Sequence, residues 1–188
     1  MSPKAFLFIL HSLDECYQIE KGIVTEMKNG FLGVTGYRLP TEAEMEYGIR
    51  AGAQTPRYYG EAEELLPKYA WYHSNSQERA WPVGSKKPND FGLFDVQGIV
   101  FTWCQENYRV YPGTTDVTQD VEGELEISSS HRVLRGGSFN NQASTVRSSD
   151  RYSSVPTGRN SNFGFRVSRT LPLDGFAASP LPPKGIEK

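Results

Sequence analysis

Short aromatic runs separated by turn-forming residues fill the middle of the chain, from residue 57 to residue 108. Gly, Pro, Asn and Asp recur so closely in this segment that each β-like piece is only a few residues long. Because such backbone forms few regular hydrogen-bonded elements, large side chains have to hold it in place. The segment predicts a loop-rich fold anchored by aromatic residues, with an aromatic binding groove as the alternative. The predicted anchors are Tyr69, Trp71, Trp81, Phe94 and Trp103.

The length and charge of the chain exclude several classes of function. Its 188 residues suit a single domain with a real core. The 20 Lys and Arg residues nearly balance the 22 Asp and Glu residues, and the net charge of -2 gives no attraction to nucleic acid or to anionic lipid. No apolar run approaches the roughly 20 residues of a membrane span. We therefore expect no nucleic-acid partner and no membrane partner.

The N-terminal stretch contains a short apolar run, AFLFIL, at residues 5–10. Signal peptides have a core of about 7 to 15 apolar residues and a small-residue cleavage site, and this stretch has neither. We interpret the run as the end of a buried helix and expect a cytoplasmic protein.

Cysteine and histidine are sparse and lack the spacing of metal ligands. Cys16 and Cys104 do not form a CxxC pair, and we expect two buried thiols. His11, His73 and His131 show no HxH or HExxH pattern. The sequence therefore predicts neither a disulfide framework nor a histidine metal site.

The clearest local signal is a helix start at Thr41. Thr41 followed by Glu44 forms a capping box, in which the hydroxyl accepts a backbone N–H and the carboxylate reaches back to the cap. The acidic residues suit the positive end of the helix dipole, and Arg50 suits the last turn. We predict a helix over residues 42–51 with Gly52 as a left-handed C-cap.

Two later segments, residues 131–139 and 163–170, alternate apolar and polar residues as strands do. In the second segment the alternation includes Phe165 and Val167. We expect the two segments to pair in one sheet. In the first segment the alternation ends at a double glycine, Gly136 and Gly137, which lets the backbone turn where a Cβ would clash.

Four motifs occur in the order typical of one family: GYRLPTEAEMEYGIRAG, WPVGSKKPNDFGLFDVQGIVFTW, RVLRGGSFNN and RNSNFGFRVSR. In this arrangement the chain resembles the sulfatase-modifying factor, or formylglycine-generating enzyme, domain, and the resemblance covers roughly residues 36–170. The resemblance implies an α+β fold, an irregular C-type-lectin-like fold with little regular secondary structure. It also implies a domain over residues 1–170 that is reduced at its N-terminal end, followed by a flexible tail over residues 171–188.

The residues that the family uses for chemistry are missing. Its oxidising members hold copper with two cysteines just after the GGS motif, since a soft thiolate pair selects Cu(I). The first of those positions falls near Asn141, and no cysteine follows it. Ile99 and Thr102 replace the Asn and Glu that help the family to hold calcium, and Ile99 offers no side-chain oxygen. We therefore expect no metal, no cofactor and no catalytic residue.

What remains after the double glycine is a polar surface rich in amides and guanidinium groups, the residue types that recognition surfaces use. The alternative is that Arg135, Arg147 and Arg166 pair with internal carboxylates, including those of the helix, and hold the core together. The candidate binding residues are Asn140, Asn141, Arg147, Asp150, Arg151, Tyr152, Arg159, Asn160 and Asn162.

The sequence leaves three functions open. The first is a non-catalytic binding or scaffold module, not an enzyme, with an unidentified protein or small-molecule ligand. The second is a formylglycine-generating-type oxidase that acts on protein or small-molecule thiols through another metal site. The third is a diversified ligand-binding protein of the diversity-generating-retroelement type, which uses the same fold and the same GGS-to-GFR segment.

Overall fold

The computed structural model describes residues 16–21, 23–27, 30, 33–111 and 131–171. Short helices and strands joined by irregular backbone make up an α+β fold with little regular secondary structure, as the sequence predicts. Within these residues no helix has the length and apolarity to cross a membrane. The predicted helix at residues 5–10 and, apart from Leu171, the predicted tail lie outside the described residues.

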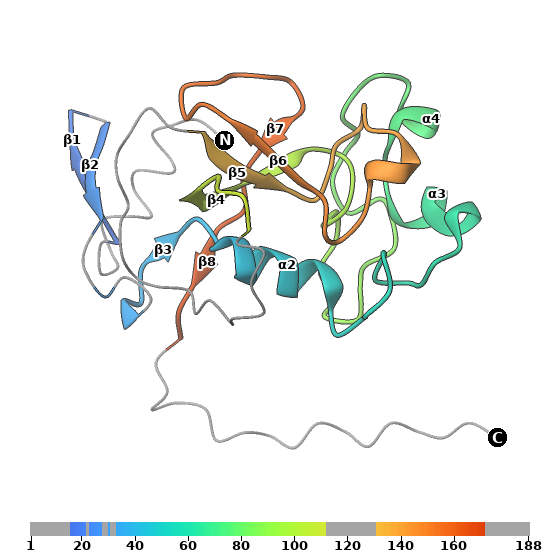
Figure 1. Ribbon diagram of the computed structural model, residues 1–188, viewed down its shortest axis with the longest axis horizontal. Helices are drawn as coiled ribbons and strands as arrows, with labels where there is room; N and C mark the ends of the chain where they lie inside the picture. Colours follow the sequence, from blue (N-terminus) through green and yellow to red (C-terminus); the bar gives the residue numbers. More distant parts are fainter. Residues whose placement is uncertain (1–15, 22, 28–29, 31–32, 112–130, 172–188) are drawn as a thin grey trace, which may run out of the picture.

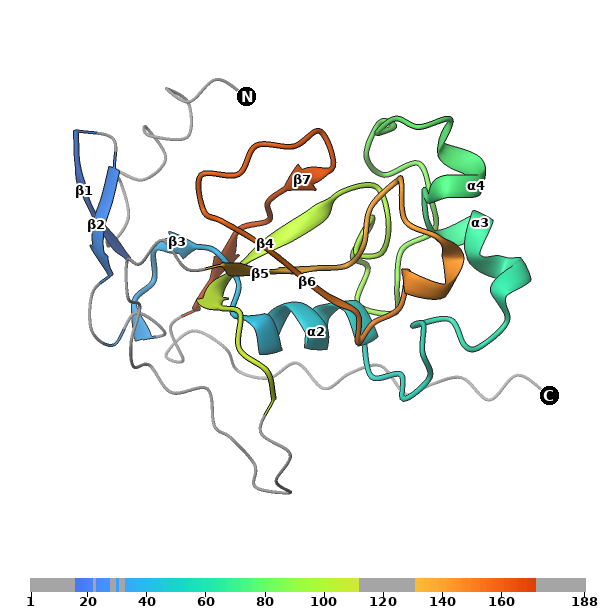
Figure 2. The same cartoon turned by 45° about the horizontal axis from the view of Figure 1, so that its top comes forward.

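A four-stranded sheet forms the centre of the fold, in the order β6-β5-β4-β7. Strand β4 (Phe101–Asn107) pairs antiparallel with β5 (Arg132–Arg135) and parallel with β7 (Phe163–Gly164), and β6 (Arg151–Ser154) completes the sheet beside β5. Helix α2 (Glu42–Arg50) crosses one face of the sheet, as Figures 1 and 2 show.

Smaller elements surround the sheet. The hairpin of β1 (Tyr17–Glu20) and β2 (Ile23–Met27) lies at one end, and the two-stranded pair of β3 (Tyr37–Arg38) and β8 (Ser168–Arg169) lies near the start of α2 (Figure 1). The other end holds the short helices η2 (Glu63–Leu65), α3 (Leu66–Tyr69), α4 (His73–Ser76) and η3 (Ala143–Thr145).

The predicted pairing of the two strand-like segments needs correction. Both contribute to the central sheet, but β4 lies between β5 and β7, so the two do not pair with each other. Strand β7 ends at Gly164, and the chain then leaves the sheet to form β8. Phe165 and Val167 therefore do not alternate into the core: they are 58% and 47% exposed.

The structure confirms the capping box at the start of α2. The backbone N–H of Glu44 donates to Thr41 Oγ1 at 3.1 Å, and the backbone N–H of Thr41 donates to Glu44 Oε2 at 2.9 Å. The predicted C-cap is one residue too late, because Ala51 already has a left-handed φ of 47° and its N–H donates to Tyr47 O. Arg38 adds a bidentate pair to Glu44, with both distances 2.6 Å, and thereby ties β3 to the helix start.

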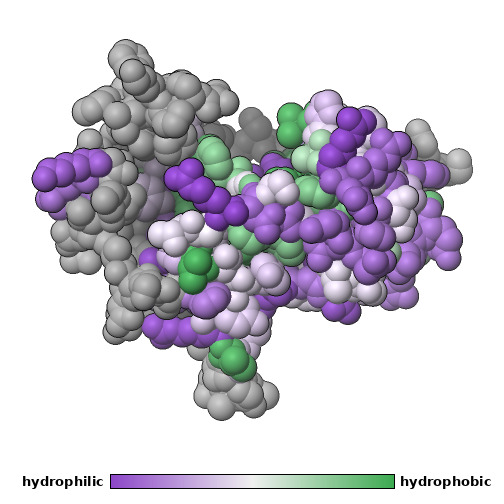
Figure 3. Space-filling view, turned by 90° about the horizontal axis from the view of Figure 1, so that it is seen from above, coloured by the Kyte–Doolittle hydropathy of each residue, from purple (hydrophilic) through white to green (hydrophobic). Residues whose placement is uncertain are grey.

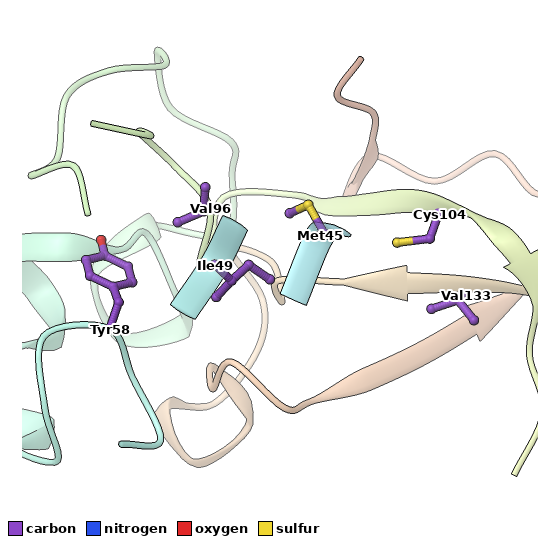
Figure 4. Close-up of a cluster of buried hydrophobic side chains, with 6 residues drawn as sticks. All are labelled: Met45, Ile49, Tyr58, Val96, Cys104 and Val133. Carbon is purple, nitrogen blue, oxygen red and sulfur yellow. The ribbon is translucent and has the colours of Figure 1, made fainter. Parts of the chain in front are cut away.

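The core forms between α2 and the sheet. Met45 and Ile49, one helical turn apart, pack with Cys104 of β4 and Val133 of β5, and Tyr58 and Val96 extend this cluster (Figure 4). Each of these side chains is at most 8% exposed. The positions of α2 that face the sheet therefore follow the helical period of the sequence.

The same face of α2 also carries charge into the interior. Arg135 of β5 is fully buried, and its guanidinium pairs with Glu46 and lies 3.6 Å from Glu42 Oε1. It also donates to the backbone carbonyls of Ser149 and Asp150 at 2.9 and 2.8 Å. The prediction that Arg135 pairs with carboxylates of the helix is confirmed.

The aromatic anchors are only partly those predicted. Tyr69 packs against the core cluster, and Trp71 and Trp81 stack on each other with their ring centroids 4.7 Å apart. Phe94 is 42% exposed, so its prediction as an anchor is wrong. More deeply buried aromatic anchors are Tyr58, Tyr72, Phe101 and Phe139.

We predict that Thr41→Ala lowers the free energy of unfolding by about 1 kcal/mol, because the N–H of Glu44 loses its acceptor. Urea denaturation followed by circular dichroism measures the difference. Thr41→Ser keeps the hydroxyl and serves as the matched control. Equal stability of the Ala variant and the wild type would show that the cap contributes nothing.

Candidate binding surface

The double glycine turns the chain sharply at the end of β5. Gly136 and Gly137 have φ values of 90° and 74°, in the left-handed region. A Cβ on Gly136 would lie 2.7 Å from the carbonyl oxygen of Val96, so the interior leaves no room for a side chain there. Ser138 and Phe139 remain buried, and the chain first reaches the surface at Asn140.

Three of the predicted asparagines meet around Ser138. The backbone N–H of Ser138 donates to Asn141 Oδ1 at 2.9 Å, and Ser138 Oγ lies 2.6 Å from Asn140 Oδ1. Asn162 reaches the same place from the chain before β7, where its Nδ2 donates to Asn140 Oδ1 at 3.1 Å. Asn140, Asn141 and Asn162 therefore all take part in the turn, where Asn140 is exposed and Asn162 is only 7% exposed.

Further buried anchors fix the segment that follows. Val146 and Ser148 are fully buried, and Gln97 Nε2 donates to Ser148 Oγ at 3.1 Å. Many of the residues between and beyond these anchors are exposed. We call ten of them the exposed set: Asn140, Gln142, Ser144, Thr145, Arg147, Ser149, Tyr152, Arg159, Asn160 and Ser161.

The other two arginines expected to pair with internal carboxylates meet this expectation only in part. Arg147 pairs with a carboxylate, that of its near neighbour Asp150 at 2.5 Å, but its side chain is 46% exposed. Arg166 donates to the backbone carbonyl of Phe94.

Arg151 is part of the scaffold and not of the exposed set. It projects from β6 beside Arg135, and its Nε and Nη2 donate to the two carboxylate oxygens of Glu42 at 2.6 and 2.8 Å. The rings of Tyr108 and Tyr111 lie 4.6 and 4.0 Å from the guanidinium carbon. Burial alone lowers the pKa of Arg151, but the hydrogen bonds and charge of Glu42 outweigh it and raise the pKa above its ordinary value.

The remaining predicted residues lie outside the Ser138 turn. Tyr152 is 50% exposed, and its ring stacks on Phe101 with the centroids 5.1 Å apart. Arg159 and Asn160 are exposed on the connection between β6 and β7. The predicted site residues thus divide into a structural group around Ser138, the scaffold residue Arg151, and an outward-facing group along the same segment.

Sequence reasoning missed the support that α4 gives to the turn. The backbone N–H of His73 donates to the carbonyl of Asn141 at 2.9 Å, and Ser76 Oγ donates to the carbonyl of Phe139, also at 2.9 Å. These contacts join residues more than 60 positions apart, and no local sequence pattern predicts them.

The thiols of the chain lie away from this surface. Cys104, 1% exposed in β4, and Cys16 are both buried thiols, as predicted. Burial, followed by the charges of Glu106 and Glu42, raises the pKa of the Cys104 thiol far above its ordinary value, which keeps it protonated. Among the described residues, no three His, Cys, Asp or Glu side chains gather as metal ligands would.

Ile99 occupies the position where the family pattern has Asn, and its backbone is unusual. Its φ is 59°, a left-handed value that Asn adopts readily and a β-branched residue rarely does. Backbone hydrogen bonds hold it there, from its N–H to Trp71 O at 2.8 Å and from the N–H of Phe139 to its carbonyl at 3.0 Å. The turn is therefore kept, although the side chain has become a buried apolar one, 3% exposed.

Comparison with known proteins identifies the same family across most of the chain. The family model of the sulfatase-modifying factor enzyme 1-like domain matches residues 14–171 of this chain. A formylglycine-generating enzyme of Streptomyces coelicolor is 32% identical over 77% of this chain and 50% of its own length. The serine/threonine-protein kinase pkn1 of Chlamydia pneumoniae is 30% identical over 80% of this chain and 24% of its own length. The chain thus spans a quarter to a half of these curated relatives.

A solved structure gives the same result for the fold. Treponema denticola variable protein 1 superposes with a TM-score of 0.75 and 32% identity, covering 88% of this chain and 66% of that protein. The predicted fold class, an α+β C-type-lectin-like fold of the formylglycine-generating-enzyme type, is confirmed.

We predict that Arg151→Ala lowers the free energy of unfolding by about 1–3 kcal/mol, because it leaves the buried carboxylate of Glu42 without its bidentate donor. Arg147→Ala is the matched control and changes stability by less than about 0.5 kcal/mol, since its ion pair is exposed. Thermal and urea unfolding of both variants test this. An equal decrease in the free energy of unfolding for the two Ala variants would contradict the assignment of Arg151 to the scaffold.

Proposed function

The chain belongs to the sulfatase-modifying factor family, and on this premise we propose that it is a non-catalytic binding module whose ligand contacts the exposed set. The ligand is a protein or a small molecule, and the module works in the cytoplasm without a nucleic-acid or membrane partner. Binding here requires no bond to be made or broken, so the residue types on the surface are sufficient for it.

One observation carries this proposal: buried anchors and outward-facing polar residues alternate along the segment after the double glycine. Ser138, Val146 and Ser148 are fully buried, and the chain between them is short. A backbone fixed in this way loses little conformational entropy when a ligand binds, which favours affinity. The outward side chains supply amides, hydroxyls and guanidinium groups for hydrogen bonds. In the view from above, hydrophilic residues predominate and enclose smaller hydrophobic areas (Figure 3).

The chemistry of the turn argues against an oxidase. Copper(I) requires soft thiolate ligands, and the position near Asn141 carries an amide whose Oδ1 already accepts from the N–H of Ser138. Cys104 is a protonated thiol inside the core, away from the double-glycine turn. An oxidase would need ligands that the described residues do not bring together.

A diversified binding protein is the second candidate, and one observation favours it. The similarity to the Treponema variable protein covers 88% of this chain. Because the anchors are buried and the exposed set makes few core contacts, the outward positions can change while the backbone stays. Sequencing the surrounding DNA tests this second candidate. A second, imperfect copy of the segment that differs mainly at adenines would support it, and the absence of such a copy would contradict it.

We predict that the purified protein binds neither Cu(I) nor Ca²⁺ at one equivalent, because it lacks the thiolate pair and because Ile99 supplies no ligand oxygen. Equilibrium dialysis with metal analysis measures this, with a family member that retains both cysteines as the positive control. Tight copper binding together with oxidation of a sulfatase-derived peptide thiol would overturn the non-catalytic proposal.

We predict that changing Gln142, Arg159 and Asn160 together to Ala removes partner binding and leaves the melting temperature within a few degrees of the wild type. All three are exposed, and such positions change stability by about 0.5 kcal/mol or less each. Quantitative pull-down from the native lysate, with thermal melts alongside, measures both effects.

The control for this triple variant changes Gln54 and Asp90 to Ala, at two exposed positions beside the C-terminal half of α2. It should keep every partner. A folded triple variant that also keeps every partner would locate the binding surface elsewhere, and an unfolded one would make these residues part of the scaffold.

A further inference from the structure

A cavity of about 250 Å³ opens at the opposite end of β4 and β5 from the double glycine. Trp103, Gln105 and Arg132 line it from the two strands, and Leu39, Cys104 and Pro156 complete the wall. Arg132 begins β5 and Gly136 follows its end, so the backbone between them spans roughly 13 Å at about 3.3 Å per residue. Only Pro156 comes from the segment that carries the exposed set.

The cavity has the size and lining for one aromatic ring. An apolar cavity of about 150 Å³ is enough to hold a benzene molecule, and most drug-sized ligands need about 300 Å³ or more. Trp103 supplies an aromatic wall, and its ring is fixed edge to face against Phe163 with the centroids 5.5 Å apart. Leu39 and Pro156 supply aliphatic walls. This favours a small planar ligand over a long flexible one.

The polar groups of the cavity belong to two residues whose positions are fixed. Arg132 donates to the backbone carbonyl of Gln105, which holds the guanidinium beside β4. The Tyr17 hydroxyl donates to Gln105 Oε1 at 2.7 Å and itself accepts from the N–H of Leu39 at 2.8 Å. The Nε2 amino group of Gln105 and the guanidinium of Arg132 are the side-chain donors of these two residues. Both polar side chains of the cavity can therefore donate hydrogen bonds.

The electrostatics of Arg132 favour an anion. Burial lowers its pKa, and this effect exceeds the opposing attraction of Glu106 and Tyr17. Glu106 and Tyr17 thus attract the guanidinium without restoring all of the solvation that burial removes. A carboxylate in the cavity would restore part of the lost solvation, because charge-assisted hydrogen bonds to Arg are among the stronger ones.

The cysteine in the wall does not suggest a reaction. Burial raises the pKa of the Cys104 thiol, and Sγ lies 3.9 Å from Thr102 O as a weak donor. A protonated, buried thiol is an apolar wall and not a nucleophile. The cavity therefore fits a binding site and no covalent step.

We propose that this cavity binds a small aromatic carboxylate, with its ring against Trp103 and its carboxylate at Arg132 and Gln105. The ligand is either a free aromatic acid or the C-terminal aromatic residue of a peptide, which present the same chemistry. The site is separate from the exposed set and does not depend on the proposed function.

Isothermal titration calorimetry of the full chain with indole-3-acetate and its neutral analogue indole-3-acetamide tests the proposal. The acid should bind the wild type at least tenfold more tightly than the amide. Arg132→Met keeps the aliphatic stem of the side chain and should bind acid and amide equally. Arg147→Met, which removes an exposed charge outside the cavity, is the matched control and should keep the full preference.

A second pair of ligands distinguishes a free aromatic acid from the C-terminal residue of a peptide as the natural ligand. Gly-Gly-Trp as the free acid and as the C-terminal amide is titrated in the same way, and the tighter of the two acids identifies the natural form. The triple variant at Gln142, Arg159 and Asn160 should keep acid binding, which separates this site from the partner surface. Equal affinity of acid and amide for the wild type, absence of binding by both acids, or an undiminished preference in folded Arg132→Met would overturn the proposal.

Discussion

The fold depends on the ionic contact between Arg135 and the two carboxylates of α2. A guanidinium with no solvent exposure is expensive to bury, and nearby acceptors and negative charge offset part of the desolvation. Glu46 and the carbonyls of Ser149 and Asp150 accept its hydrogen bonds. Glu42 adds a negative charge 3.6 Å from Nε, which is itself left without a hydrogen-bond partner. Since these groups come from the helix and from the turn before β6, helix, sheet and turn can adopt only one mutual arrangement. Apolar contacts such as those of Met45 and Ile49 are less directional and could not impose it.

The parts of the fold that the sequence predicts correctly are those set by neighbours in the chain. Thr41 and Glu44 are three residues apart, so the start of α2 follows from their chemistry alone. Arg151 was predicted on the surface because its local context is polar. Its actual partner, Glu42, is 109 positions away. Arg151 reaches it because β5 and β6 pair in the register that places Arg151 opposite Arg135. That register is a tertiary property and has no local signature.

The candidate site shows the same division. The double glycine predicts where the chain turns, and the asparagines after it gather there as expected. Which of them would be structural was not predictable, because it depends on Ser138 being buried beneath them. The exposure of Phe165 was missed for a related reason: apolar alternation implies burial only while a strand continues, and β7 ends before Phe165. The cavity beside Arg132 has no sequence signal, since its walls come from four separate parts of the chain.

The stacking of Arg151 on Tyr108 and Tyr111 has a consequence for how the sheet can open. The guanidinium also donates to Arg109 O, and the N–H of Tyr108 donates to His131 O at 2.7 Å. The chain just after β4 and the chain just before β5 are thus tied to each other and to β6. Because one guanidinium and one backbone hydrogen bond join the ends of three neighbouring strands, local unfolding of this corner has to break several contacts together.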